Sequence, residues 1–261
     1  YDHEWINKTI YQNAYVRTDS YFDNSPLASS GLPSKNELEL LNVWKDEIPA
    51  EVFTETFTPP ITDGSGNDRK NLLKAKEILE KEGWFVEDGK LVKDGKEFKF
   101  EFLIVSPSDE KIALAYQSNL KKLGITMDVR TVDSSQYQER LLSYDFDMIK
   151  RYWGVSLSPG NEQQFYWGSE VGQKDGSRNY PGINSPAVDA LIEKLISATN
   201  REELTTAIHA LDRVLLWGHY VVPLYHSNKD RIAYWDFFEY PDEIPLYGIV
   251  IESWWINKDK Q

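Results

Sequence analysis

The stretch from residue 98 to residue 153 constrains the fold most, because two kinds of hydrophobic spacing alternate along it. Apolar residues in short alternating or continuous runs predict strands over 98–105, 125–132 and 146–153. Helical spacing between them predicts helices over 106–124 and 135–144. Strands that alternate with helices form a mainly parallel sheet with helices on its faces. The sequence therefore predicts an α/β fold.

The loop that follows the third predicted strand is the first place to expect a site. In open parallel sheets, ligands bind beyond the carboxyl ends of the strands, where loops can reach inward. Here that loop runs over residues 153–182 and contains several polar and aromatic side chains.

Further elements flank this unit. Helical spacing and capping residues predict helices over 3–17, 34–44 and 68–81, and two more that begin at Ser185 and Asn200. Short strands are expected over 221–225 and 231–235. Residues 18–33 and 48–67 are rich in proline, glycine and polar residues, which is typical of irregular loops.

Composition excludes several classes of protein. The 261 residues carry a formal net charge of −13 and no lysine- or arginine-rich run, so neither nucleic acid nor an anionic membrane surface is an expected partner. There is no cysteine, which excludes disulfides and thiolate chemistry. Aromatic residues make up 13%, a surplus that suits a cleft with flat apolar walls.

The common signatures of enzymes and metal sites fail. The four histidines lack the spacing of a zinc protease, and no Gly-x-Ser-x-Gly motif is present. The segment 63–74 has Asp68 and Lys74 where a calcium loop needs glycine and glutamate. Asp145 and Asp147 could form a glycosidase pair, but they stand at the amino end of a strand, away from the expected ligand side. No cofactor and no metal are therefore expected.

The order of motifs over nearly the whole chain carries a resemblance. The segment 146–154 (FDMIKRYWG) leads into 156–163 (SLSPGNEQ), then 165–169 (FYWGS) and 177–183 (SRNYPGI). This order resembles the family 5 extracellular solute-binding proteins, the peptide, dipeptide and nickel receptors of ABC importers. The Ser-Pro-Gly-Asn-Glu stretch is most similar to the oligopeptide subgroup of the Yej type.

The resemblance implies a type II periplasmic-binding-protein fold, in which two lobes close on the ligand about a hinge. Residues 1–225 are expected to form the second lobe, with a mixed, mostly parallel sheet flanked by helices. Residues 226–261 are expected to return to the first lobe. That N-terminal lobe is not in the sequence, which begins at Tyr1 without methionine, so we expect the chain to be part of a longer protein.

A peptide receptor must pair the charged ends of its ligand, because an unpaired buried charge is costly. On this reasoning Arg140, Lys150 and Arg151 are candidates for a ligand carboxylate. Strand alternation puts Lys150 and Arg151 on opposite faces, so at most one of them is expected to be well placed. Glu162, or the backbone over 158–161 with Gly160 and Asn161, is the candidate for a ligand ammonium group.

The remaining candidates are two tryptophans and three polar residues. Trp153 and Trp167 are expected to wall the pocket, and Arg178 and Asn179 to offer hydrogen bonds. Oligopeptide-binding members of the family place an aspartate shortly after the tryptophan to hold the ligand's amino terminus, whereas Ser156 stands there in this chain. This departure leaves recognition of a free amino terminus open.

The sequence thus favours a periplasmic receptor that binds peptides or peptide-like compounds without covalent chemistry and delivers them to an ABC permease. Three alternatives stay open. One is an oligosaccharide receptor of the same family, suggested by the aromatic surplus. Another is a glycosidase that uses Asp145 or Asp147 with Glu162. The third is a purely structural interaction domain.

Overall fold

The three strands predicted within residues 98–153 pair in one parallel sheet in the computed structural model, which describes residues 1–246 and 248–260. β5 (Lys99–Ile104) is the central strand, with β6 (Thr126–Thr131) on one side and β7 (Met148–Ile149) on the other. This finding confirms the α/β prediction. β7 is shorter than the predicted strand over 146–153, because its pairing with β5 ends at Ile149.

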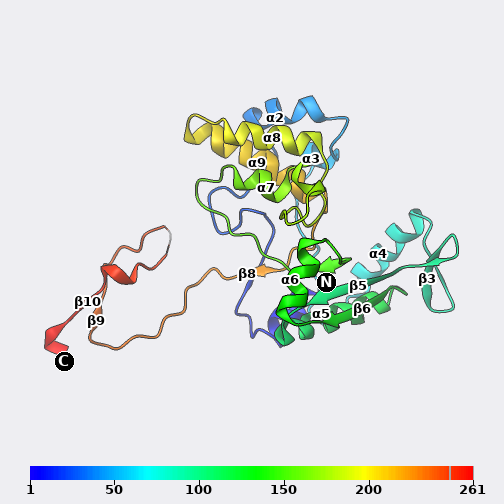
Figure 1. Cartoon of the computed structure of the whole chain (residues 1–261), viewed down its shortest axis with the longest axis horizontal. Helices are drawn as coiled ribbons and strands as arrows, with labels where there is room; N and C mark the ends of the chain where they lie inside the picture. The colour runs from blue at the N-terminus through cyan, green and yellow to red at the C-terminus, as the bar shows by residue number, and fades with distance from the viewer. Residues whose placement is uncertain (247, 261) are drawn as a thin grey trace.

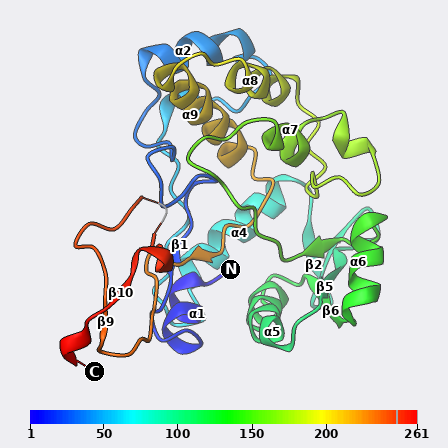
Figure 2. The ribbon, with the colours of Figure 1, turned by 60° about the vertical axis from the view of Figure 1, so that its left-hand side comes forward.

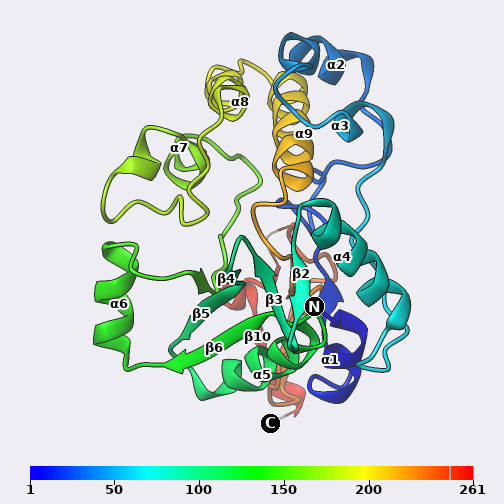
Figure 3. The same cartoon turned by 90° about the vertical axis from the view of Figure 1, so that its right-hand side faces the viewer.

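Helices cover both faces of this sheet (Figure 3). α5 (Pro107–Lys121) begins where Ser106 caps the helix, and α6 (Ser134–Leu142) begins where Asp133 does the same. Alternation along β5 sends Phe102 and Ile104 into the core under α5, while Leu103 enters the core under α6. The second half of the central strand β5 is therefore buried on both sides, as is usual in a parallel sheet.

A second, antiparallel sheet precedes β5 in the chain. It is formed by β2 (Phe85–Glu87), β3 (Lys90–Lys93) and β4 (Lys96–Glu97), and it follows α4 (Arg69–Lys81). Asp68 caps α4, as the sequence predicts. The backbone N–H of Leu91 donates to the Gly124 carbonyl at 2.7 Å, which joins this small sheet to the α/β unit.

A separate helical layer lies above the α/β unit in Figure 1. It is built from α2 (Lys35–Leu41), η1 (Asn42–Trp44), α3 (Glu51–Thr54), α7 (Glu162–Trp167), η2 (Val171–Gln173), α8 (Pro186–Ile196) and α9 (Arg201–Trp217). Its core buries apolar residues of all its α-helices, among them Trp167, Leu191 and Leu211. The capping box of Ser34 and Glu37 begins α2, as predicted.

Two segments that are far apart in the sequence meet beside these units. After α1 (His3–Thr9), β1 (Val16–Arg17) pairs antiparallel with β8 (Tyr225–His226). The residues beyond β8 extend away from the rest of the molecule in Figures 1 and 2. They contain β9 (Phe238–Glu239), η3 (Ile251–Ser253), β10 (Trp255–Ile256) and η4 (Lys258–Lys260), and β9 pairs with β10.

Three predictions about the ends were wrong. The helix predicted over 3–17 stops at Thr9, because Gln12 and Asn13 adopt positive φ angles of 53° and 59°, which a helix cannot contain. The strand predicted over 221–225 is paired only at its last residue, Tyr225, and the one over 231–235 is not a strand. Apolar residues there favour strands locally, but no neighbouring strand pairs with them.

Candidate functional site

A buried aspartate of α9 fixes the loop that follows β1. Asp212 is 0% exposed and accepts four hydrogen bonds, from the Ser20 hydroxyl (2.8 Å), the Tyr21 N–H (2.8 Å), and the N–H and hydroxyl of Ser29 (3.0 and 2.7 Å). Burial raises the pKa of Asp212, and the four donors act against that rise. The result is a rigid loop whose residues Ser20, Tyr21 and Asp23 line a cavity.

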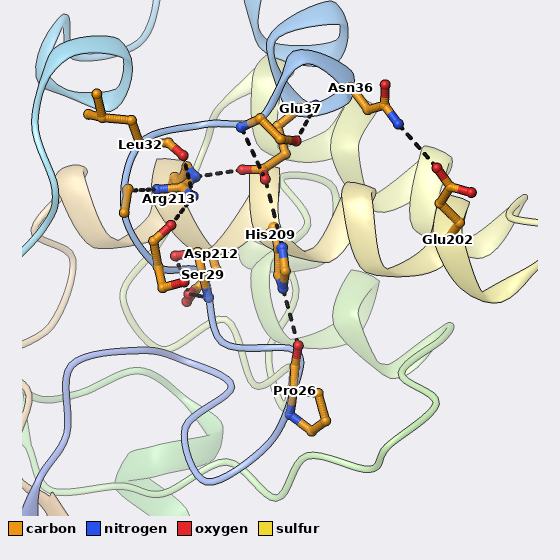
Figure 4. Close-up of polar contacts among 12 residues, drawn as sticks. Pro26, Ser29, Leu32, Asn36, Glu37, Glu202, His209, Asp212 and Arg213 are labelled. Carbon is orange, nitrogen blue, oxygen red and sulfur yellow. Dashed lines mark hydrogen bonds and ion pairs between the residues drawn. The ribbon is translucent and has the colours of Figure 1, made fainter.

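The next residue of α9 fixes the continuation of the same loop (Figure 4). Arg213 Nε donates to Glu37 Oε2 at 2.6 Å, and its other nitrogens donate to the carbonyls of Ser30, Gly31 and Leu32. Burial alone would raise the pKa of Glu37, but the donors His209 and Arg213 lower it to about 2. Two adjacent residues of one helix therefore hold residues 20–32 in place.

The carboxyl end of the parallel sheet contributes a second wall. Lys150, directly after β7, forms an ion pair with Asp109 in the first turn of α5. Lys150 Nζ also donates to Tyr225 Oη at 3.3 Å, and the Tyr225 hydroxyl lies 2.7 Å from that of Tyr11. Burial raises the pKa of Tyr225, so its hydroxyl stays protonated. This chain of contacts links the sheet edge to β8.

Aromatic rings form a continuous row between the two walls. Tyr21 packs edge-on against Trp167 at a centroid distance of 5.0 Å, and Trp167 lies 4.9 Å from Trp153. Trp153 lies 6.4 Å from Tyr180, and the guanidinium carbon of Arg151 lies 5.0 Å from the centre of the Tyr180 ring. Such a row offers flat apolar contact that ends at a cation.

Together these walls enclose a cavity of about 620 Å³ that is open on one side. It lies beyond the carboxyl ends of β5 and β7 and is bounded by the loop after β1, the segment 146–153, the Tyr180 loop and the segment 219–226. A volume of this size fits a small organic ligand. A smaller hollow of about 220 Å³ lies among the residues after β8, away from these charged groups.

Three predicted site residues line this cavity: Lys150, Arg151 and Trp153. Both basic residues reach it because β7 ends at Ile149, so strict strand alternation no longer applies to them. Trp167 supports the wall from behind Trp153 and is 2% exposed.

The other predicted residues lie outside the cavity lining. Arg140 forms ion pairs with Glu101 and Asp145, both at 2.8 Å, on α6. Arg178 is exposed, with its guanidinium carbon 5.9 Å from the centre of the Phe165 ring. Their charges therefore face other parts of the surface.

Four further candidates serve the turns around α7. The Ser156 hydroxyl accepts the Ser158 N–H, and the Gly160 N–H donates to both carboxylate oxygens of Glu162 at 2.9 and 3.0 Å. Asn161 occupies the position before α7 and is exposed. These contacts shape the turn between the site loop and the helical layer.

The buried side chain of Asn179 stabilises the Tyr180 loop by hydrogen bonds to the backbone. It is 0% exposed, its amide donates to the carbonyls of Gly168 (3.0 Å) and Ile183 (2.8 Å), and its oxygen accepts the Ile183 N–H. With these bonds made, its side chain positions the neighbouring Tyr180 at the cavity.

Sequence reasoning missed Tyr21, Asp23, Asp109 and Tyr225. Asp109 could have been predicted from the rule that ligands bind beyond the carboxyl ends of parallel strands, because it stands in the first turn of the helix after β5. Tyr21 and Asp23 gave no local signal, since the loop that carries them is placed by Asp212 of α9, 192 residues beyond Ser20.

The three carboxylates considered for glycoside hydrolysis do not share a cleft. Asp145 pairs with Arg140, and Glu162 bonds to the Gly160 N–H outside the cavity. Asp147 alone lines the cavity, where it accepts the Glu101 N–H at 2.8 Å. Within residues 1–246 and 248–260, no group of three or more metal-ligating side chains is present. Over the same residues, no helix has the length and apolar character to cross a bilayer.

Comparison with known proteins defines the class. The sequence model for bacterial extracellular solute-binding proteins, family 5 Middle, matches residues 1–175, and the chain belongs to this family. Its fold is that of the type II periplasmic binding proteins. The structure of the oligopeptide-binding protein AppA from Bacillus subtilis, in complex with a nonapeptide, superposes with a TM-score of 0.65 at 22% identity. That match covers 99% of this chain and 46% of AppA.

Two curated relatives are more similar in sequence. The "Probable peptide-binding protein YejA" of Agrobacterium fabrum is 42% identical over 99% of this chain. The "Peptidoglycan-binding protein YepA" of the same organism is 40% identical over 97% of it. The chain spans 42% of the length of each relative. The predicted resemblance to family 5 and to its Yej-type subgroup is thereby confirmed.

Proposed function

We propose that this chain forms the second lobe, together with the segment that returns to the first lobe, of a solute receptor that delivers peptides or peptide-like compounds to an ABC permease. The cavity of about 620 Å³ at the carboxyl ends of β5 and β7 carries this proposal. Its walls combine a row of aromatic rings with fixed charges, which suits a ligand with apolar side groups and charged ends. The relatives YejA and YepA, named as a probable peptide-binding protein and a peptidoglycan-binding protein, support the same ligand class.

In this proposal residues 1–225 belong to the second lobe and residues 226–261 return to a first lobe. The β1–β8 pair supports this division, because it brings residues 16–17 and 225–226 together at one crossing point. Beyond it, Trp235, Leu246 and Ile251 are 73%, 90% and 68% exposed. Apolar side chains this exposed suit packing against another segment of the same protein. Closure of the two lobes about β1 and β8 would then cover the cavity in the periplasm.

Mass spectrometry of ligands that co-purify with the full-length protein tests the proposal most directly. A second test compares thermal stabilisation by tripeptide libraries and by an oligosaccharide panel, since a ligand that binds the folded state raises the melting temperature. We expect peptides to co-purify and to stabilise the protein. Saturable stabilisation by sugars alone would refute the peptide assignment.

The same experiment addresses the oligosaccharide alternative, which the row from Tyr21 to Tyr180 favours, because sugar rings also stack on aromatic side chains. A glycosidase is not supported by the geometry, since Asp145 and Glu162 are held outside the cavity. Release of sugars from the same panel during incubation would contradict this reasoning.

A further inference from the structure

Arg151 differs from Arg140 and Lys150, the two other candidates for a ligand carboxylate. Arg140 and Lys150 each form an ion pair with a carboxylate. Over the residues that the structure describes, no carboxylate oxygen lies within 4.0 Å of the Arg151 guanidinium. Arg151 is nevertheless only half-exposed and lines the cavity. It is therefore a cation with a free charge at the place where a ligand would lie.

The surroundings of Arg151 orient it without neutralising it. Its guanidinium carbon lies 5.0 Å from the Tyr180 ring centre, and its Nη2 donates to Tyr180 Oη at 3.4 Å. Its Nε is buried and has no hydrogen-bond acceptor among the described residues. A buried donor without a partner is costly, so such groups in folded proteins usually have one. Tyr180 thus holds a guanidinium whose Nε lacks an acceptor and which has no carboxylate partner among the described residues.

The other charges of the cavity wall are already engaged. Asp109 is paired with Lys150, Asp23 lies 3.5 Å from the His226 ring, and Asp147 accepts a backbone N–H. Among the described residues that line the cavity, the buried hydroxyls of Tyr1 and Tyr21 also lack a hydrogen-bond partner. The row of rings from Tyr21 to Tyr180 connects Tyr21 with Arg151.

We propose that Arg151, held by Tyr180, is the residue that binds a carboxylate of the ligand, and that carboxylate-bearing compounds are therefore the ligands of this site. This inference rests on the proposed function. A guanidinium presents its donors in a rigid fork that fits a carboxylate in bidentate fashion, whereas an ammonium cannot do so. Lys150 is then a positioning residue, which holds Asp109 and the β8 residue Tyr225 at the edge of the site.

The test uses the full-length protein and three tripeptide libraries. The first has free carboxyl ends, the second has amidated ends and no acidic residues, and the third has amidated ends with one aspartate or glutamate. The readout is the concentration that gives half-maximal thermal stabilisation. Removal of one partner of a desolvated charge pair costs about 30-fold or more in affinity. We therefore expect the wild-type protein to bind the second library about 30-fold more weakly than the first.

Two variants assign this preference to Arg151. In Arg151→Gln the preference for the first library over the second should disappear. Arg151→Lys keeps the charge without the fork and should keep part of the preference, and it decides the matter if the glutamine variant does not fold. Arg130→Gln is the matched control, because Arg130 is 59% exposed and lies outside the cavity lining.

The outcomes separate this inference from the proposed function. Equal binding of the first two libraries by the wild-type protein, or a full preference in Arg151→Gln, overturns the role of Arg151 and leaves peptide binding intact. Stabilisation by none of the three libraries overturns the proposed function and the inference with it. Tight binding of the third library identifies a side-chain carboxylate as a sufficient partner, whereas weak binding assigns the role to the terminal one.

Discussion

Replacement of Arg213 by methionine removes one half of a buried ion pair in the helical layer. The side chains of Arg213 and Glu37 are 5% and 6% exposed, and the distance from Nε to Oε2 is 2.6 Å. The guanidinium also donates to the carbonyls of Ser30, Gly31 and Leu32 at 2.7 to 3.3 Å (Figure 4). Methionine fills a similar volume, so the main loss is the charge and its donors.

The expected cost follows from the group that stays behind. A buried charge that loses its partner destabilises a protein by about 3–5 kcal/mol. The three carbonyls lie in a part-buried loop where water can replace the lost donors, so they add about 1 kcal/mol at most. We expect Arg213→Met to lower the free energy of unfolding by about 4 kcal/mol. Urea unfolding at pH 7, followed by tryptophan fluorescence, measures this value.

The matched control is Lys76→Met. The Lys76–Glu80 pair spans 3.5 Å with side chains 53% and 41% exposed, so its loss should cost no more than about 0.5 kcal/mol. The double variant Glu37→Met/Arg213→Met should recover part of the loss, because no buried charge is left unpaired. A loss below about 1 kcal/mol in Arg213→Met, or a double variant less stable than Arg213→Met alone, would refute the reasoning.

Two other predictions concern pH and backbone. Burial raises the pKa of Asp23 from 3.8 to about 7, so the folded state binds the extra proton and stability falls as pH rises from about 4 to about 7. Asp23→Asn should flatten this fall and stabilise the protein by at least about 1.4 kcal/mol at pH 8 in urea titrations; an unchanged pH profile contradicts it. Gly124 has φ +79°, and a Cβ there would lie 2.8 Å from the Leu91 nitrogen, whereas Gly89 has φ +80° and open space. Gly124→Ala should therefore cost at least about 1 kcal/mol more than Gly89→Ala in the same assay, and equal losses would exclude the close contact.

Much of the fold follows from local patterns that act at short range. The alternation over residues 98–153 correctly predicts three parallel strands and two helices, because the strands and the helices that cover them follow one another in a single segment of the chain. Helix starts at Ser34, Asp68 and Asn200 are correct for the same reason, since a cap acts within one turn. Predictions fail where a strand needs a partner that is distant in the sequence. Of the strand predicted over 221–225, only Tyr225 is in a strand, where it pairs with Arg17.

The site was less predictable, because the sequence does not show which polar groups are already engaged. Arg140 and Lys150 are both basic residues near the third strand, yet one pairs with Asp145 on α6 and the other with Asp109 at the cavity. Asn179 stands in the predicted loop, but its bonds are made to the loop's own backbone. The structure separates the two cases. A polar side chain whose partners lie within the protein has a structural role, whereas one without such partners is available to a ligand.

The cavity lies next to the β1–β8 pair, so the contacts of Lys150 and Arg151 bear on how the two regions are connected. Lys150 stands where the parallel sheet ends, and its hydrogen bond to Tyr225 reaches the strand that pairs with β1. Arg151, the adjacent residue, faces the cavity with its charge free of any carboxylate among the described residues. A ligand bound by Arg151 therefore lies one residue away from a contact that leads to the β1–β8 crossing. A ligand that binds Arg151 more tightly in one geometry of that crossing would shift the protein toward this geometry.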